Sequence, residues 1–399
     1  MALAAVRLVV GRPRFKPLLA SICAGAFADA MVELVISWLV LTASNSPLLV
    51  GVVFALGMAP QLVLGLPAGA LADRYERRVL IALANGAAAC IALALSVLLL
   101  LGRLSLAAIL IPIFFLGIAS TLRTASNQAL AYDTVGQSNA ATAIALANLG
   151  SALLGTVGAV VGGVLVGARL PPAAIGLAAI LYAAAAFLAI QCRVARHIDI
   201  GAAPAALHDG LRLIQHNRVI SLIVLLVAAT EIFGFSGSVL LPTFARDVFA
   251  VGSTGLGALV GAKSLGGVVG LLLFAVSNST GHKGRWLLVA CGGLGAMLAI
   301  FAMLPVFALA IFVLMVAGGS AAVVDTLAQT LLQDVATGPR RGAAMGVWLF
   351  SIGLGPIGFL ALGAVALAVG ARAAQLASGL LLIGIVVGLA TSPRIRELP

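Results

Sequence analysis

The sequence predicts an all-α polytopic membrane protein with twelve transmembrane helices in two pseudo-symmetric six-helix bundles, and three observations lead to this fold class. Of its 399 residues, 62% are hydrophobic and only 9% are charged, whereas a soluble protein carries about 25% charged residues. Apolar stretches recur along the chain at the length of roughly 20 residues that a bilayer-crossing helix needs. The basic residues gather on one side of the predicted membrane. Together these observations exclude a set of soluble domains.

Twelve apolar spans follow one another along the chain, six on each side of a polar segment. The first six are predicted near residues 17–42, 48–71, 79–101, 106–131, 139–167 and 173–192. The polar segment near 193–218 ends in a short amphipathic helix from His208 to Arg218. The last six are predicted near residues 219–244, 254–277, 286–304, 306–332, 342–369 and 373–391. Several spans exceed 20 residues, which implies helices that tilt or extend beyond the hydrocarbon.

The distribution of basic residues predicts the orientation of the chain. Seventeen lysines and arginines fall on the side of the two termini and the central segment, and four fall on the opposite side. The positive-inside rule therefore makes both termini and the central loop cytoplasmic. The formal net charge of +11, from 23 basic and 12 acidic residues, follows from this topology and requires no nucleic-acid partner. We expect a multi-pass protein of the inner (plasma) membrane.

A short internal match indicates that the two halves are a duplicated unit. The pattern Thr-Leu followed by Gln six residues after the Leu occurs at 121–128 and again at 326–333, in the fourth and tenth spans. Two six-helix halves joined by a long connection suggest alternating access around a central cavity. The predicted domains are an N-terminal bundle over 1–192, a cytoplasmic linker over 193–218 and a C-terminal bundle over 219–399.

The most specific stretch of the sequence is residues 69–78, Gly-Ala-Leu-Ala-Asp-Arg-Tyr-Glu-Arg-Arg, between the second and third spans. It resembles the G-x-L-x-D-R-x-x-R-R/K signature of the major facilitator superfamily, and this resemblance implies the major facilitator fold. The aspartate can accept hydrogen bonds from a helix N-terminus, and the arginines can pair with carboxylates. We expect a conformational-switch motif made of Gly69, Asp73, Arg74, Arg77 and Arg78.

Other stretches are similar to one branch of that superfamily, which includes enterobactin-type siderophore exporters and macrolide efflux proteins. They are residues 46–51, 240–248 and 330–333, the last followed by Arg341-Gly342. This resemblance implies efflux of drug-like or siderophore-like compounds by an antiporter. Drug antiporters of the family carry a G-P-x-x-G-G motif in the fifth span, and this chain keeps the glycines but lacks the proline. The glycines expected to allow close helix packing are Gly158, Gly162 and Gly163.

Six charged residues inside the predicted spans are candidates for a functional site, because a charge at the bilayer centre costs at least about 2.5–3.5 kcal/mol. Asp29 and Glu33 lie one helical turn apart on one face of the first span, about 18 and 24 Å along it. Two carboxylates at this spacing are expected to titrate as a coupled unit. The candidate proton or substrate sites are Asp29, Glu33, Glu231, Lys263, Asp325 and Arg123.

An alternative interpretation makes some of these charges structural. Glu231 with Lys263, and Asp325 with Arg123, would then form fixed ion pairs. Under the functional interpretation the carboxylates carry protons or bind cationic substrates. An acidic cavity of this kind favours neutral or cationic amphipathic compounds over anions.

The sequence thus favours a secondary active transporter, specifically a proton-coupled exporter of small amphipathic organic compounds. Import or facilitated diffusion of a nutrient or lipid is the alternative within transport. An intramembrane enzyme is disfavoured, because no histidine lies in a predicted span to serve as a catalytic base or metal ligand. The expected partners are a small-molecule substrate, protons and membrane lipids. We expect a monomer with no cofactor, no metal and no bound nucleic acid.

Overall fold

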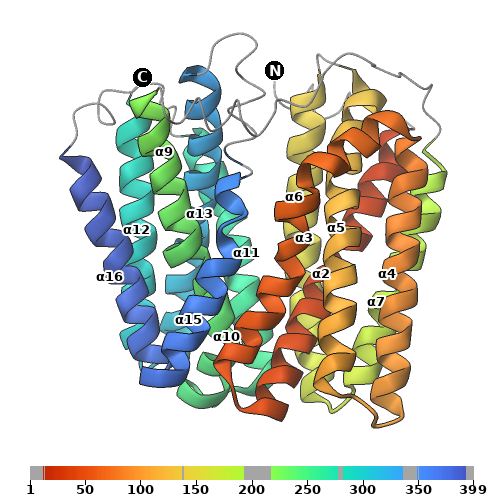
Figure 1. The fold of residues 1–399 in the computed structure, drawn as a ribbon, viewed down its shortest axis with the longest axis horizontal. Coiled ribbons are helices and arrows are strands. Elements are labelled where there is room, and N and C mark those ends of the chain that lie inside the picture. Colours follow the sequence, from red (N-terminus) through yellow and green to blue (C-terminus); the bar gives the residue numbers. More distant parts are fainter. Residues whose placement is uncertain are drawn as a thin grey trace. The chain divides into compact units, whose positions relative to one another are not determined.

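The computed structural model describes residue 12 and residues 14–136, 139–192, 217–276, 282–335, 348 and 350–391. Within these residues, twelve helices are long and apolar enough to cross a membrane. Figure 1 shows them as long helical ribbons. The prediction of an all-α protein with twelve membrane spans is therefore confirmed.

Each of the first six spans is one α-helix, and local sequence explains several of its ends. The Ser105 hydroxyl accepts a hydrogen bond from the Ala108 N–H at 3.2 Å and so caps the N-terminus of the fourth span, α5. Two other helices begin with a proline, whose missing N–H costs no helical hydrogen bond in the first turn. The helices are α2 (Phe15–Ser44), α3 (Pro47–Arg74), α4 (Arg77–Leu100), α5 (Leu106–Val135), α6 (Ala140–Gly167) and α7 (Pro171–Ile190).

The seventh span crosses the membrane as predicted but is not a regular helix. Its segments are α9 (Arg218–Ala229), the π-helical η2 (Thr230–Gly234), the 3₁₀-helical η3 (Phe235–Leu240), α10 (Leu241–Thr243) and the π-helical η4 (Phe244–Val248). Gly237 lies within the 3₁₀ segment and Pro242 within α10, and both residue types weaken a continuous α-helix. Short π-helical insertions often occur at functional sites.

Four of the remaining spans are regular helices, namely α11 (Gly252–Val276), α12 (Lys283–Met303), α13 (Phe307–Val335) and α16 (Ala371–Ala390). In the eleventh span, residues 350–352 are helical, a turn follows at residues 353–354, and α15 (Gly355–Val369) completes the span. The eleventh span was predicted to begin at residue 342, which lies outside the described residues.

The chain forms two compact units that differ from the two halves of the sequence. The first, called unit 1 here, comprises residues 1–38 and 59–202, and the second, called unit 2, comprises residues 39–58 and 203–399. The end of α2 and the start of α3 therefore group with unit 2. The predicted domain boundaries at 192 and 219 remain a prediction.

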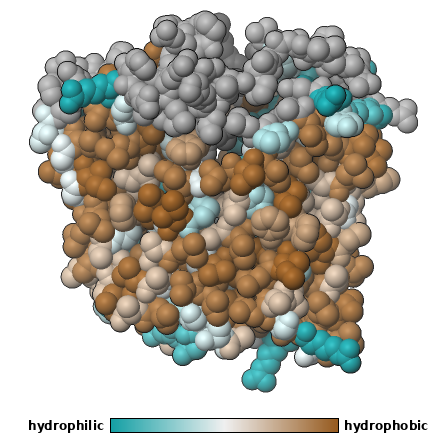
Figure 2. All heavy atoms as spheres, viewed as in Figure 1, coloured by the Kyte–Doolittle hydropathy of each residue, from teal (hydrophilic) through white to brown (hydrophobic). Residues whose placement is uncertain are grey.

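In unit 1, α4 packs along both α5 and α7. Phe15, Leu18, Ile81 and Leu130 form part of a buried apolar cluster in this unit. Other apolar side chains such as Leu83 remain exposed, which is typical of helices that face lipid. Figure 2 shows that hydrophobic residues cover most of the visible surface of the described helices.

In unit 2, α13 packs along α11 and α12, and α12 packs along α16. The core of this unit includes Leu226, Leu287, Leu294 and Leu331, all nearly or fully buried. The segment 39–58 joins this core through close backbone contacts, such as those of Gly51. A Cβ at Gly51 would lie 2.5 Å from the Phe359 carbonyl oxygen of α15, so α3 and α15 touch here without intervening side chains.

Arg246 also holds the segment 39–58 to the rest of unit 2. Its Nη1 donates a hydrogen bond to the Leu41 carbonyl oxygen at 2.9 Å, and its Nη2 donates to Asn45 Oδ1. The Leu41 carbonyl lies in the last turn of α2 and also accepts a hydrogen bond from the Asn45 N–H at 2.9 Å. The guanidinium therefore links η4 to the end of α2.

Candidate functional site

Unit 1 contains a buried charge cluster between α2, α5 and α7. Arg123 of α5 forms an ion pair through Nη2 with Asp29 Oδ2 of α2. The Tyr182 hydroxyl of α7 donates a hydrogen bond to Asp29 Oδ1 at 2.6 Å. The Arg123 side chain is only 6% exposed, whereas the Asp29 side chain is 41% exposed. The Asp29 carboxylate thus neutralises a buried guanidinium while part of its own surface remains exposed.

The guanidinium of Arg123 has further partners in unit 1. Its Nη1 donates to Asn85 Oδ1 at 3.1 Å, and its plane lies over the Tyr182 ring with 5.6 Å from Cζ to the ring centroid. Asn85 Nδ2 and Ser126 Oγ are buried and have no hydrogen-bond partner among the described residues. Buried polar atoms of this kind are ordinarily satisfied by ordered water.

The glycines of α6 fix the position of α2 beside this cluster. A Cβ at Gly158 would lie 2.2 Å from the Phe27 carbonyl oxygen, and one at Gly162 would lie 3.1 Å from Met31 Cγ. Phe27 and Met31 stand on either side of Asp29 in α2. Only glycine at residue 158 permits this approach, so the glycines position the carboxylate. Gly163, the third predicted packing glycine, is also buried.

Glu33 lies one turn further along α2 and is exposed. The structure gives Asp29 two close partners from other helices, Arg123 and Tyr182. The sequence had instead suggested a pair of poorly solvated carboxylates, Asp29 with Glu33. Their coupled titration remains a prediction.

Unit 2 places its acidic residues in a different environment. Glu231 lies in the π-helical η2 and is 6% exposed. Asp325 of α13 and Lys263 of α11 are near enough for their charges to act on Glu231. A Cβ at Gly355 of α15 would stand 3.6 Å from Glu231 Oε2. The Glu231 carboxyl makes no hydrogen bond or ion pair with another described residue.

Lys263 of α11 contacts two residues of the seventh span. Its Nζ donates a hydrogen bond to Ser238 Oγ of η3 at 2.6 Å and lies 5.8 Å from the centroid of the Phe235 ring. The alternative from the sequence paired Lys263 with Glu231 and Arg123 with Asp325. Arg123 instead finds its carboxylate on α2 of its own unit, so that part of the alternative is wrong.

Other buried polar groups of unit 2 lack hydrogen-bond partners among the described residues. The Trp348 indole lies beside Asp325, and its buried Nε1 completes no hydrogen bond of ordinary geometry with a described residue. Gln375 of α16 is 1% exposed, and both polar atoms of its side chain are likewise unpaired within the described part of the chain. Unit 2 thus presents polar groups that its own described side chains leave unsatisfied.

The basic motif at the α3–α4 connection is partly described. The surroundings of Gly69 and of the Asp73 side chain are not among those that the structure describes. Arg74 is exposed. Arg77 donates to Asp133 Oδ2 at 2.7 Å and also to two backbone carbonyl oxygens. Arg78 donates to Glu76 Oε1 at 2.6 Å. The arginines therefore connect α4 to α5 and to the loop.

Sequence reasoning missed several members of these clusters. Asn85, Tyr182 and Ser238 complete the contacts of Arg123, Asp29 and Lys263, but none was a predicted site residue. The signal was available, because a polar side chain inside an apolar span needs a partner. The partner itself is not visible in sequence, since the helices that bring the two together lie far apart along the chain.

These observations define a class of protein. Twelve apolar helices with ion pairs and carboxylates buried at membrane depth are the features of a polytopic membrane transporter. The chain belongs to the transmembrane secretion effector family of the major facilitator superfamily, whose family profile matches residues 10–397.

Two curated relatives are transporters. The chain is 30% identical over 198 residues to the multidrug efflux pump Tap of Mycolicibacterium fortuitum. The matched segment covers 49% of this chain and 47% of the relative. It is 25% identical over 248 residues to the staphyloferrin A transporter of Staphylococcus aureus (strain NCTC 8325 / PS 47), which covers 60% of this chain and 61% of the relative. The chain thus spans about half to three fifths of the length of these relatives.

Solved structures share the fold over nearly the whole chain. The nucleoside transporter NupG matches with a TM-score of 0.75 at 14% identity, covering 95% of this chain and 98% of that one. A POT family transporter in complex with 5-aminolevulinic acid matches with a TM-score of 0.79 at 11% identity, covering 96% of each chain. At these identities the likeness shows the fold alone. The family and these structures are transporters and not enzymes.

Proposed function

We propose that this protein exports small amphipathic organic compounds and couples their export to protons by alternating access. The observation that carries the proposal is the cluster of Asp29, Arg123 and Tyr182 in unit 1. A half-exposed carboxylate at membrane depth is there the counter-charge of a buried guanidinium. Asp29 is the proton carrier in this proposal.

The coupling follows from the energetics of a buried ion pair. A proton that binds Asp29 removes the negative charge and leaves the Arg123 guanidinium without a counter-charge. Removing one partner of a buried ion pair costs about 3–5 kcal/mol. Protonation therefore disfavours this arrangement of α2, α5 and α7, and it favours any other conformation in which Arg123 is better solvated.

Substrate binding is assigned to unit 2. Glu231 and Asp325 are near one another and have no basic hydrogen-bond partner among the described residues, and Trp348 adds an unpaired donor and an aromatic ring. Carboxylates of this kind favour neutral or cationic amphipathic compounds. The names of the relatives, a multidrug efflux pump and a staphyloferrin A transporter, support a small organic substrate, and the first of them supports the export direction.

The proposed topology follows the distribution of basic residues, with both termini cytoplasmic in the inner membrane. The motif of Gly69, Asp73 and the three arginines acts as the conformational switch. Arg77 supports this role, because its hydrogen bonds to Ala129 and Asp133 tie the start of α4 to the end of α5, and its hydrogen bond to Ala72 ties it to α3. We propose that the monomer is sufficient for transport.

The test uses purified protein in proteoliposomes that contain a pH-sensitive dye. A panel of cationic, neutral and anionic amphipathic compounds is added after a pH gradient has been imposed. We expect cationic or neutral members to dissipate the gradient as they are transported, and anions to have no effect. Transport of a cationic member with no movement of protons would contradict the coupling, and response to anions alone would contradict the substrate class.

A further inference from the structure

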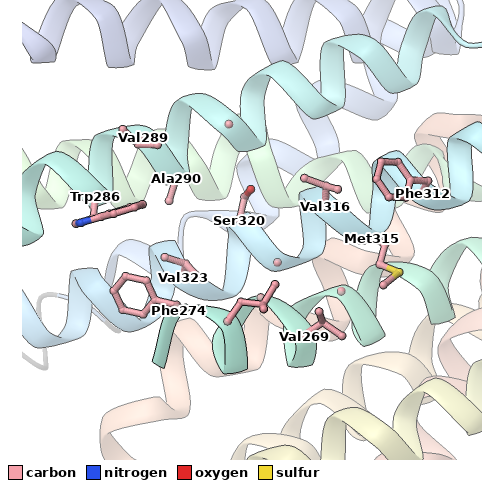
Figure 3. A pocket seen from close by; sticks show the side chains of 15 residues that line it. Val269, Phe274, Trp286, Val289, Ala290, Phe312, Met315, Val316, Ser320 and Val323 are labelled. Atoms are coloured by element: carbon pink, nitrogen blue, oxygen red, sulfur yellow. The ribbon is translucent and has the colours of Figure 1, made fainter. Parts of the chain in front are cut away.

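A groove on the surface of unit 2 is lined by none of the charged residues described above. Its volume is about 600 Å³, and it is lined by α11, α12 and α13. Figure 3 shows Trp286 and Phe274 near one end and Phe312 and Met315 near the other, with Ser320 between them. This volume falls within the range of about 300–1,000 Å³ that ligand pockets occupy.

The groove is hollow because glycines line its floor. A Cβ at Gly266 would lie 1.8 Å from the Met315 carbonyl oxygen, and one at Gly270 would lie 2.4 Å from Gly319 Cα. The backbones of α11 and α13 therefore touch directly at these positions. No side chain rises from Gly266, Gly270 or Gly319 to fill the space between α11 and α12, each of which packs on α13.

The rim of the groove faces away from the interior of unit 2. Leu273, Val289 and Phe312 all line it and are 66%, 63% and 64% exposed. Its lining is apolar except for the Ser320 hydroxyl and the Trp286 indole N–H. An apolar rim on membrane-spanning helices favours a hydrocarbon chain as the occupant.

The end of the groove at Trp286 has the features of a headgroup site. Tryptophan is enriched at the membrane–water interface, and Trp286 lies in the first turn of α12. Arg285 is exposed and lies four residues before Val289, on the same face of the helix. Lys283 donates to Asp334 Oδ2 at 2.7 Å, whereas the Arg285 guanidinium makes no hydrogen bond or ion pair with another described residue. A guanidinium without a carboxylate partner in the described part of the chain thus stands at the interfacial end of an apolar groove.

We propose that this groove binds one acyl chain of an anionic phospholipid, with the lipid phosphate held by Arg285. The lipid comes from the leaflet on the basic side of the protein, where α12 begins. Basic sites between transmembrane helices are known to attract anionic lipid headgroups. The charge of Arg285 selects the headgroup, and the glycine floor accommodates the chain.

The test measures which lipid contacts Trp286. The variant with Trp38→Phe and Trp348→Phe keeps Trp286 as its sole tryptophan. It is placed in nanodiscs of phosphatidylcholine and phosphatidylglycerol in equal amounts, with brominated acyl chains on one lipid or on the other. The lipid composition is then identical in the two samples, which differ only in which lipid carries the bromine atoms that quench tryptophan fluorescence. We expect phosphatidylglycerol to be preferred about fivefold at Trp286, which is the effect of one basic side chain near an anionic headgroup.

Two pairs of variants separate the site from the general lipid shell. Arg285→Gln is expected to abolish the preference, whereas Arg218→Gln on α9, which does not line the groove, keeps it. Ser320→Phe fills the groove and is expected to reduce the preference, whereas Ile300→Phe on the exposed face of α12 does not. Equal quenching by the two brominated lipids in the parent variant would overturn the proposal.

A second measurement uses the unaltered tryptophans. Native mass spectrometry of the detergent-purified full chain counts bound phosphatidylglycerol in the wild type, in Arg285→Gln and in Arg218→Gln. We expect one retained lipid in the wild type and in Arg218→Gln, and its loss in Arg285→Gln. Equal retention in all three proteins would contradict the assignment to Arg285.

Discussion

Asp29 in unit 1 is bound by a guanidinium and a phenol hydroxyl, whereas Glu231 in unit 2 makes no hydrogen bond or ion pair with another described residue. Both carboxylates lie in equivalent spans, the first and the seventh. The helix around Asp29 is regular and is held by the glycines of α6, whereas Glu231 lies in a π-helical segment of a broken span. The two units thus give their intramembrane acids opposite environments: Asp29 is half-exposed and paired, whereas Glu231 is buried and has no such partner among the described residues.

This difference teaches what each acid is suited to do. A carboxylate that already neutralises a buried cation changes the stability of its unit when it gains a proton, because the cation is then left alone. A carboxylate without such a partner is available to a ligand. We therefore propose that unit 1 carries energy coupling and unit 2 carries substrate binding.

The largest expected effect is on stability, and it tests the comparison directly. Asp29→Asn leaves Arg123 buried without a counter-charge and is expected to lower the free energy of unfolding by about 3 kcal/mol. Glu231→Gln removes a buried charge that has no paired partner, so we expect little loss or a small gain. Denaturation of the purified variants in detergent measures both.

The double variant Asp29→Asn with Arg123→Gln is the control for this prediction. Removing both charges is expected to recover part of the stability lost in the single variant, because no buried cation remains unpaired. Equal losses in Asp29→Asn and Glu231→Gln would remove the distinction between the two units.

The next prediction tests whether the close contact of α6 with α2 positions Asp29 in unit 1. Gly158→Val brings side-chain atoms within 2.2 Å of the Phe27 carbonyl oxygen and is expected to cost about 1–3 kcal/mol through overpacking. Gly86→Val in α4 is the matched control, because a Cβ there has no neighbour within 4 Å. If both variants unfold alike, the glycine contact does not position α2.

The smallest effect compares the ion pairs at the basic ends of the units. In unit 1, Asp133 forms an ion pair with Arg77, and both side chains are about 15% exposed. In unit 2, Asp334 forms an ion pair with Lys283, and their side chains are 44% and 28% exposed. We expect Asp133→Asn to cost about 1–2 kcal/mol and Asp334→Asn less than about 1 kcal/mol. The same denaturation experiment ranks them, and a reversed order would show that exposure does not decide these pairs.

The spans of this protein were predictable from sequence to within a few residues, except that the predicted start of the eleventh span lies outside the described residues. Hydropathy is a local property, and each apolar run such as 79–101 carries its own signal, here realised as Arg77–Leu100. The interruption of the seventh span was not predicted, although Gly237 and Pro242 were visible. Whether such residues break a helix depends on what packs against it, here Gln375 of α16 at Gly237.

The charged residues were identified from sequence but their partners were not. Depth along a span can be counted from sequence, so Asp29, Arg123 and Glu231 were all recognised as embedded charges. Pairing depends on which faces of distant helices turn toward one another. A span that is apolar on all faces has no hydrophobic periodicity to show which face turns toward a neighbouring helix. The alternative interpretation, which paired Arg123 with Asp325, was wrong for this reason.

The most direct test of the central claim compares Asp29→Asn with Glu231→Gln in proteoliposomes. Accumulation of a cationic substrate driven by a pH gradient is measured beside exchange of labelled for unlabelled substrate without a gradient. We expect Asp29→Asn to lose the driven accumulation while exchange persists, and Glu231→Gln to weaken both because binding is impaired. Normal driven accumulation in Asp29→Asn, or loss of accumulation with normal exchange in Glu231→Gln, would contradict the division of roles between the two units.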